Sequence, residues 1–382
     1  KLRVLESVLA RRSDPKAIGR RGSWLFCGDA RFRAARPGRS EIRANRVLTV
    51  AAVQMEIRLV VNGSQYTDVI YSLAARAASQ GAEFIVFPEY SGLPLLGMVP
   101  GLPRTLERAG SLDDAAAKAG GEGIRVLDVF RLLGPHCTRA YRAAFSSVAK
   151  ALGVHIATGS MILPDDRARD GAMRSVGYIF GPNGEEVGRY SKCHLMPVEA
   201  AWGISTGDSV PVFDVAGVAT SMPICMDATY FETFRLARLS GADLVAVPSA
   251  NPEDYNLWYA LRGIWPRVQE SQVFGIGASM VGTFAGMTFT GRSAILAPLE
   301  LTSGGDGFIA QARTCDQEEV VVGAIDLGAL YRYRAENPLR FNIGLYQKYL
   351  PGLYRVAQAA RQASLGPGEE GVAGGEDDSE DA

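Results

Sequence analysis

The chain has 382 residues, of which 47% are hydrophobic and 21% are charged, and its formal net charge is −1 at pH 7. This length and composition allow a sizeable core in one large domain or two ordinary ones. A charge near zero excludes a global field that would draw the protein to nucleic acid or to an anionic membrane. No apolar stretch reaches the roughly 18–20 residues that cross a bilayer, so neither nucleic acid nor a membrane is an expected partner.

Cysteine usage indicates a reducing compartment. The chain has five cysteines, an odd number, without the CxxC spacing of a zinc ribbon. Scattered cysteines argue against a disulfide framework, and the N-terminus has no apolar segment typical of a secretory signal. We therefore expect a cytoplasmic protein with reduced cysteines: Cys27, Cys137, Cys193, Cys225 and Cys315.

Residues 1–46 form an Arg-rich N-terminal extension with short apolar islands. We expect this extension to be partly ordered and to pack on the body of the protein or on a neighbouring subunit. Aromatic and basic residues do not interleave along it, so it lacks the pattern of a nucleic-acid-binding tail.

The pattern changes at Val47, where regular elements begin. The segment 97–123 is rich in glycine, alanine and proline, and it is expected to be an irregular loop with one short helix. β-branched runs, helical periodicity and turn signals predict the other elements. These are a strand over 47–53, a helix over 66–80, a strand over 84–87, a helix over 141–152, a strand over 154–161 and a hairpin of 176–180 with 186–190.

The second half of the chain repeats this alternation after a loop over 193–210. It predicts strands over 217–224, 243–247 and 273–280, helices over 230–240 and 257–271, a hairpin of 293–297 with 319–325, and a Gly-rich hairpin loop over 302–307. Alternating strands and helices predict a layered α/β domain in which helices cover the sheets. No linker separates the halves, so residues 47–335 are expected to form one domain.

The end of the chain has two further parts. Residues 336–365 form an apolar C-terminal arm, which we expect to cross to a partner subunit or to wrap the body. Residues 366–382 are rich in glycine and acidic residues and are predicted to be disordered.

Three polar side chains follow predicted strands and form a candidate catalytic trio. Cys225 closes an apolar run at a strand-to-helix bend, where backbone N–H groups can receive negative charge. Glu89 follows the strand over 84–87, and Lys192 follows the hairpin. A carboxylate can take the proton of an attacking thiol, and a lysine ammonium can stabilise the thiolate and then an oxyanion. The trio predicts cleavage of a carbon–nitrogen bond through a thioester.

Four short motifs occur in order along the chain and resemble those of the nitrilase superfamily, the carbon–nitrogen hydrolases. They are Phe87-Pro88-Glu89-Tyr90, Arg189-Tyr190-Ser191-Lys192-Cys193-His194-Leu195, Gly207-Asp208 and Pro223-Ile224-Cys225-Met226-Asp227. The resemblance covers about residues 47–335. It implies a four-layer α-β-β-α sandwich, a Glu–Lys–Cys triad of Glu89, Lys192 and Cys225, and a homodimer or larger assembly.

The resemblance also assigns supporting residues. Glu199 matches a second glutamate that orients the lysine, and the backbone N–H of Met226 would help to hold the oxyanion. Tyr90, Trp202, Ser249 and Asn251 are candidates for contacts with the substrate.

The motifs depart from the family at some positions, and one residue bears on the branch. Ser191 replaces the usual arginine before the lysine, and Met226 stands where an aromatic residue is usual after the nucleophile. An aspartate at position 227, after Cys-Met, resembles the motif of the amidase and carbamoylase branches rather than that of the nitrilase branch. Cys193-His194 has no second ligand pair at metal spacing.

The sequence therefore predicts an enzyme that needs neither a metal nor an organic cofactor. It would hydrolyse an amide or carbamoyl group in a small molecule and release ammonia or an amine. Nitrile hydrolysis, acyl transfer to an amine, and a catalytically silent scaffold whose tails bind a partner stay open as alternatives.

Overall fold

The computed structural model describes residues 2–27, 46–121, 123–165 and 171–364. The chain divides into two units, residues 1–333 and 334–382, and each is described by itself. The whole predicted acidic tail, residues 366–382, and much of the predicted N-terminal extension lie outside the described residues.

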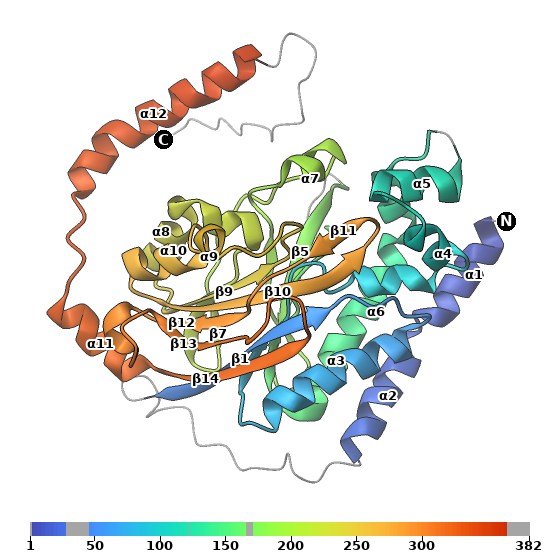
Figure 1. Ribbon diagram of the computed structural model, residues 1–382, viewed down its shortest axis with the longest axis horizontal. Helices are drawn as coiled ribbons and strands as arrows, with labels where there is room; N and C mark the ends of the chain where they lie inside the picture. The colour runs from blue at the N-terminus through green and yellow to red at the C-terminus, as the bar shows by residue number, and fades with distance from the viewer. Residues whose placement is uncertain (1, 28–45, 122, 166–170, 365–382) are drawn as a thin grey trace, which may run out of the picture. The chain divides into compact units, whose positions relative to one another are not determined.

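Helices occur along the whole described chain (Figure 1). The α-helices are α1 (Leu2–Arg12), α2 (Pro15–Cys27), α3 (Gly63–Ala78), α4 (Leu102–Glu107), α5 (Leu112–Gly120), α6 (Val126–Leu152), α7 (Pro197–Ala201), α8 (Phe231–Leu239), α9 (Leu257–Ala260), α10 (Ile264–Ser271), α11 (Leu327–Glu336) and α12 (Ile343–Ser364). Short 3-10 helices are η2 (Leu93–Met98), η3 (Cys225–Thr229) and η4 (Leu299–Leu301).

The described strands join into one curled, fourteen-stranded sheet. They are β1 (Val47–Glu56), β2 (Phe84–Val86), β3 (His155–Ala157), β4 (Met161–Pro164), β5 (Met173–Phe180), β6 (Glu186–Ser191), β7 (Phe213–Val215), β8 (Val218–Ser221), β9 (Leu244–Ser249), β10 (Phe274–Phe284), β11 (Met287–Phe289), β12 (Ala294–Leu296), β13 (Phe308–Gln311) and β14 (Glu319–Asp326). The main path runs β4-β5-β3-β2-β1-β10-β9-β8-β7.

Strand β1 is buried on both faces, and its alternating side chains define two layers. Ala51, Val53 and Met55 belong to the apolar cluster that includes the inner faces of α3 and α6. Leu48 and Val50 belong to a second cluster, which is filled from the other half of the sheet. Because successive side chains of a strand point to opposite faces, β1 lies between a helical layer and another layer of strands.

Strand β9 shows the mirror arrangement. Leu244 and Ala246 join the cluster between the two halves of the sheet, whereas Val245 packs with Phe234 of α8 and Val268 of α10. The layers are therefore helix, sheet, sheet and helix, with α3 and α6 on one side and α8 and α10 on the other (Figure 1). This confirms the predicted α-β-β-α fold class.

The two halves of the sheet meet where β1 runs parallel to β10. This pairing is short and places Met55 opposite Met280 and Glu56 opposite Val281. Beyond it, β1 pairs in parallel with β2 and antiparallel with β14. Such a join lets the sheet curl back on itself and bury its concave face.

The predicted hairpin of residues 293–297 with 319–325 is wrong. Strand β12 pairs with β13, and β14 pairs along its whole length with β1. The Gly-rich residues 302–307 lie in the connection between β12 and β13, as a hairpin loop should. Pairing of β14 with the first strand depends on contacts across the whole chain, which local patterns do not contain.

Several predicted helices have different bounds in the structure. The predicted helix over 257–271 is broken into α9 and α10 at Gly263. The loop over 97–123 contains two helices, α4 and α5. Helix α6 begins at Val126 and continues through Pro135. Its buried face holds it together, because Phe130, Leu133 and other apolar side chains at helical spacing all pack into the core.

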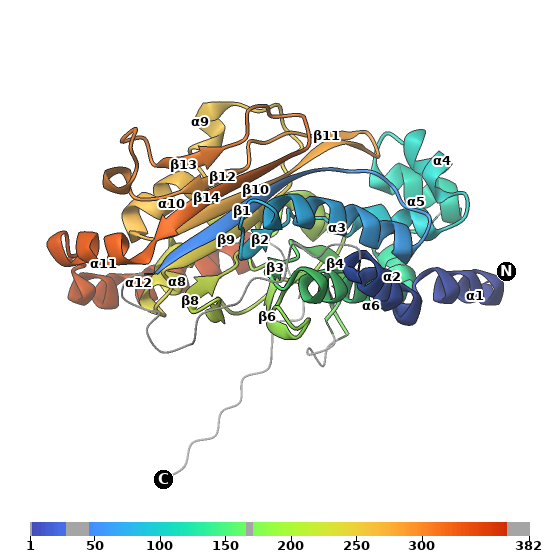
Figure 2. The ribbon, with the colours of Figure 1, turned by 90° about the horizontal axis from the view of Figure 1, so that it is seen from below.

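Two helices form the described part of the N-terminal extension. Helix α2 packs against α6 and α3, as Figure 2 shows. Leu9 and Ile18 are each 1% exposed, and the Arg12 guanidinium donates to the carbonyl oxygen of Met98 over 2.7 Å. Arg21 forms an ion pair with Asp68 on α3. This part of the extension is therefore docked on the body of its own chain.

Within the described residues, none of the helices is long and apolar enough to cross a membrane. Helix α12 forms most of the described part of the second unit and contains Tyr346, Tyr349 and Tyr354. Its expected role as an arm that wraps the body or reaches a partner subunit stays a prediction.

Candidate active site

Glu89 lies just beyond β2, where the chain passes close to the connection between β3 and β4. Gly159 has a φ of 76°, and a Cβ atom there would lie 1.8 Å from the carbonyl oxygen of Pro88. Glycine is required at this position because only it combines a positive φ with so close an approach. The Pro88-Glu89 segment is thereby seated deep in the fold, and Glu89 is 1% exposed.

Lys192 follows β6, and Glu199 lies in α7, the short helix of the next loop. Both side chains are 0% exposed. The backbone N–H of Lys192 donates to Ser175 on β5, which continues the pairing of the hairpin past its last residue. Glu199 accepts from the backbone N–H of Met196 over 2.8 Å at the beginning of α7. The hairpin and the helix thus point a buried cation and a buried carboxylate at one place.

The structure brings Glu89, Lys192 and Glu199 into one hydrogen-bonded chain. Lys192 Nζ lies 2.8 Å from Glu89 Oε1 and 2.6 Å from Glu199 Oε2. The other oxygen of Glu89 accepts from the backbone N–H of Ala250 over 3.1 Å. Buried charges of this kind are tolerated only when they are paired and hydrogen-bonded, and here the ammonium is shared by two carboxylates.

Tyr90 completes this network. Its hydroxyl donates to Glu199 Oε1 over 2.5 Å, so both oxygens of Glu199 accept hydrogen bonds. The backbone of Tyr90 has a φ of 59°, which is uncommon for a residue other than glycine. The sequence suggested Tyr90 as a contact for the substrate, whereas in the structure its polar atom is bonded to Glu199.

Cys225 is the first residue of η3, and three residues separate it from the end of β8. It is half-buried, and its φ of 46° gives the sharp bend that the sequence predicted at this place. Its thiol contacts the Glu89 carboxylate and the Ala250 backbone N–H. Cys225, Glu89 and Lys192 therefore converge, although they come from three separate parts of the chain.

Burial and charge perturb the titration of this group of side chains. Burial raises the pKa of Glu89 to about 7, with the nearby Lys192 charge opposing the shift and the Glu199 charge adding to it. Burial also raises the pKa of the Cys225 thiol, which the Glu89 charge raises further and the Lys192 charge lowers. Burial lowers the pKa of Lys192, but the charges of Glu89, Cys225 and Glu199 outweigh it, and the net shift is upward.

The remaining predicted residues lie around this cluster in different ways. Met226 is the second residue of η3, in a first helical turn, where backbone N–H groups have no intrahelical partner. Trp202 follows α7, and its indole N–H donates to Asp113 of α5 over 3.0 Å. Ser249 and Asn251 flank Ala250, so their segment lies against Glu89.

Sequence reasoning missed two contributors to the cluster. The Ala250 backbone N–H carries no signal in the sequence, because any residue other than proline supplies one. Asp227 was treated only as an indicator of the branch, yet it is 0% exposed and bonds to the residues on both sides of the site, Ile224 and His194. The signal available in the sequence was an aspartate two residues after a candidate nucleophile.

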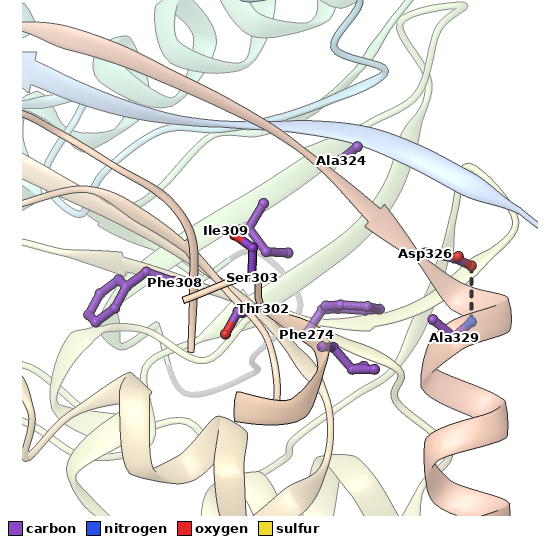
Figure 3. Close-up of a pocket in the computed structure, with 9 residues that line it drawn as sticks. Phe274, Thr302, Ser303, Phe308, Ile309, Ala324, Asp326 and Ala329 are labelled. Atoms are coloured by element: carbon purple, nitrogen blue, oxygen red, sulfur yellow. Dashed lines mark hydrogen bonds between the residues drawn. The ribbon is translucent and has the colours of Figure 1, made fainter. Parts of the chain in front are cut away.

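A separate cavity of about 260 Å³ lies beside β13, β14 and α11 (Figure 3). The residues that line it include Phe274, Phe308, Ile309, Thr302 and Ser303, and Asp326 accepts the backbone N–H of Ala329. None of the residues that line it belongs to the predicted site.

Comparison with known proteins identifies the family. Residues 49–335 match the model of the carbon–nitrogen hydrolases, which is most of the chain. The protein therefore belongs to the carbon–nitrogen hydrolase family, the nitrilase superfamily that the motifs resemble.

Its curated relatives are distant. "Probable hydrolase YhcX" of Bacillus subtilis is 24% identical over 76% of this chain and 52% of its own length. "Nitrilase" of Pyrococcus abyssi is 30% identical over 47% of this chain and 62% of its own length. "Omega-amidase NIT2" of Xenopus tropicalis is 26% identical over 62% of this chain and 87% of its own length. The chain thus spans about half the length of the Bacillus protein.

Solved structures share the fold. An amidase from Nesterenkonia sp. superposes with a TM-score of 0.54 at 21% identity, covering 77% of this chain and 96% of its own. At this identity the likeness concerns the fold.

Proposed function

We propose that the protein hydrolyses a carbon–nitrogen bond of a small amide or carbamoyl compound through a thioester on Cys225. The observation that carries this proposal is the position of Lys192 Nζ, within 2.8 Å of Glu89 and 2.6 Å of Glu199, beside the Cys225 thiol. Several relatives are named as amidases, including the Xenopus omega-amidase, which supports the substrate class.

The first half-reaction forms the thioester. Because burial raises the pKa of the Cys225 thiol, the thiol is protonated at neutral pH and needs a base. Glu89 takes that proton as the sulfur attacks the carbonyl carbon. The oxyanion that results is stabilised by the Lys192 ammonium and the Met226 backbone N–H. Glu89 then returns the proton to the leaving nitrogen, the carbon–nitrogen bond breaks, and ammonia or an amine departs.

The second half-reaction restores the enzyme. Glu89 removes a proton from water, the hydroxyl oxygen attacks the thioester, and the same donors hold the oxyanion. Collapse expels the Cys225 sulfur, which recovers its proton, and the carboxylic acid leaves. Glu199 keeps Lys192 in place through both steps. The proposal needs no metal, and homo-oligomeric assembly and a cytoplasmic location stay predictions.

The test is a panel of small amides, carbamoyl compounds and nitriles, with ammonia as the readout and intact mass as the assay for an acyl adduct. We expect ammonia from at least one amide or carbamoyl compound, an adduct on Cys225, and neither with the variant C225A. Ammonia only from nitriles would transfer the proposal to nitrile hydrolysis. Capture of the acyl group by an added amine in place of water would favour acyl transfer.

The proposal would be overturned if no compound of the panel released ammonia and iodoacetamide did not label Cys225. The relative named as a nitrilase is the reason why nitriles belong in the panel. The carboxylic acid product should also be identified, because its release together with ammonia shows that the ammonia comes from cleavage of the compound tested.

A further inference from the structure

The backbone at Cys225 must be held by its surroundings. Its φ of 46° lies in the left-handed region, which is strained for a residue with a side chain and persists only where neighbouring contacts fix it. The short helix η3 has five residues, Cys225–Thr229, and supplies little support by itself. The contacts that hold this turn therefore decide where the thiol points.

Asp227 makes those contacts. It is fully buried, and its carboxylate accepts the backbone N–H of Ile224, the residue just before Cys225, over 3.0 Å. The same carboxylate accepts the backbone N–H of His194 over 2.7 Å and that of Cys193 over 3.4 Å. One side chain thus ties the turn that carries the thiol to the loop that follows Lys192.

The His194 ring also contacts the Asp227 carboxylate and connects it to Tyr230. Its Nδ1 lies 2.7 Å from Asp227 Oδ1, and the ring donates to this oxygen in the tautomer that carries a proton on Nδ1. The ring also packs on Tyr230, with the two ring centroids 4.4 Å apart, and Tyr230 is the N-cap of α8. The side chain of His194 is 38% exposed, so it can be replaced with little loss of core packing.

We propose that Asp227 and His194 form a clasp that positions Cys225 against Lys192 and Glu89. Asp227 is a positioning residue, and His194 is its outer partner. The inference rests on the proposed function, because it takes Cys225 as the nucleophile and Glu89 as its base. A clasp of this kind explains how two segments that are distant in the chain, 192–194 and 224–227, keep one geometry.

A measurement of thiol alkylation tests the clasp without any substrate. The labelling of Cys225 by iodoacetamide is followed by peptide mass as a function of pH. In the wild-type protein we expect labelling to rise near the pKa of Glu89, about 7, because an ionised Glu89 takes the proton. In a protein with a broken clasp the thiol leaves its base, and labelling should follow an ordinary thiol, near pH 8.5.

Four variants separate positioning from general stability. The variant D227N puts an amide N–H₂ against backbone donors, and H194A removes only the ring. The variant H194N keeps a donor nitrogen at the place of Nδ1. As a matched control, D326N alters an aspartate that also accepts a backbone N–H, that of Ala329 over 3.0 Å, outside the site.

We expect D227N and H194A to move the alkylation profile upward by about one pH unit or more, with H194N restoring most of the shift and D326N causing none. In the steady state kcat should fall by about tenfold or more in D227N while KM stays nearly unchanged, because positioning acts on the transition state. Should D227N fail to fold, H194A and H194N carry the comparison.

A folded H194A with the alkylation profile and the kcat of the wild type would overturn the clasp, as would a shift that H194N does not reverse. Failure of the proposed function is a different outcome. In that case the wild-type protein would turn over no member of the panel, whereas the alkylation profiles would still differ among the variants.

Discussion

Replacing Tyr90 with phenylalanine removes one hydroxyl from the buried network and keeps the aromatic ring. The hydroxyl donates to Glu199 Oε1 over 2.5 Å, and the other oxygen of Glu199 holds Lys192 Nζ at 2.6 Å. A hydrogen bond to a charged group contributes about 1.5–3 kcal/mol, and 1.36 kcal/mol is a factor of ten in rate. If the whole contribution acts through the position of Lys192 in the transition state, kcat of Y90F falls roughly 10- to 150-fold.

The assay is steady-state release of ammonia from the best amide of the panel, with melting temperature as the measure of folding. The control is Y141F. The Tyr141 hydroxyl is also buried and donates to the carbonyl oxygen of Thr158 over 2.7 Å, but it does not join the Lys192 network. Its loss should lower stability by about 1 kcal/mol and leave kcat near the wild-type value.

A direct contact between Tyr90 and the substrate, as the sequence suggested, predicts a different result. In that case Y90F raises KM or changes the preference among amides, and kcat changes little. A folded Y90F with the kcat of the wild type would therefore refute the reasoning that Tyr90 acts through Glu199 and Lys192.

Three further results are expected. Because burial raises the pKa of Glu89 to about 7, kcat/KM should rise with pH through that value. The unfolded chain gives up this proton at lower pH, so the wild type should lose stability relative to the variant E89Q as the pH rises from the ordinary carboxyl range to about 7. A difference in melting temperature between E89Q and the wild type that stays constant over that range would contradict this. The variant C225A should show no turnover at a melting temperature close to that of the wild type, and residual turnover above the background would exclude Cys225 as the nucleophile. The variant G159A should lose both stability and activity, because its Cβ would lie 1.8 Å from the Pro88 oxygen. The control G81A has a φ of 90° and open space around it, so it should lose only the smaller amount of stability that a side chain costs at a positive φ. Equal melting temperatures for the two variants would contradict the steric argument.

Local patterns were sufficient for the layers of this fold. The buried strand at β1, the amphipathic α3 and the hairpin of β5 and β6 all carry their periodicity in a short window. Helix α6 was only half predicted, because Pro135 is a helix breaker in a local argument. In the structure the apolar face of α6 packs on both sides of that proline, and tertiary burial outweighs the missing hydrogen bond.

Long-range contacts were beyond such patterns. The pairing of β14 with β1 joins the two ends of the domain, and nothing in either strand specifies the other. The site divides in the same way. Glu89, Lys192 and Cys225 could be found because each follows a strand and lies in a motif, whereas the contact of Tyr90 with Glu199 and the contact of Ala250 with Glu89 join segments that are distant in the chain.

The docking of α2 bears on how shortened versions of this protein should be designed. Ile18 is 1% exposed, and its Cδ1 atom would lie 2.5 Å from a Cβ at Gly63, the first residue of α3. A truncated protein that begins at residue 49, the start of the family match, would expose to water the apolar surface that α2 covers. It would also lack the first two residues of β1. Such a fragment invites self-association, so a trimmed gene should retain the first 27 residues.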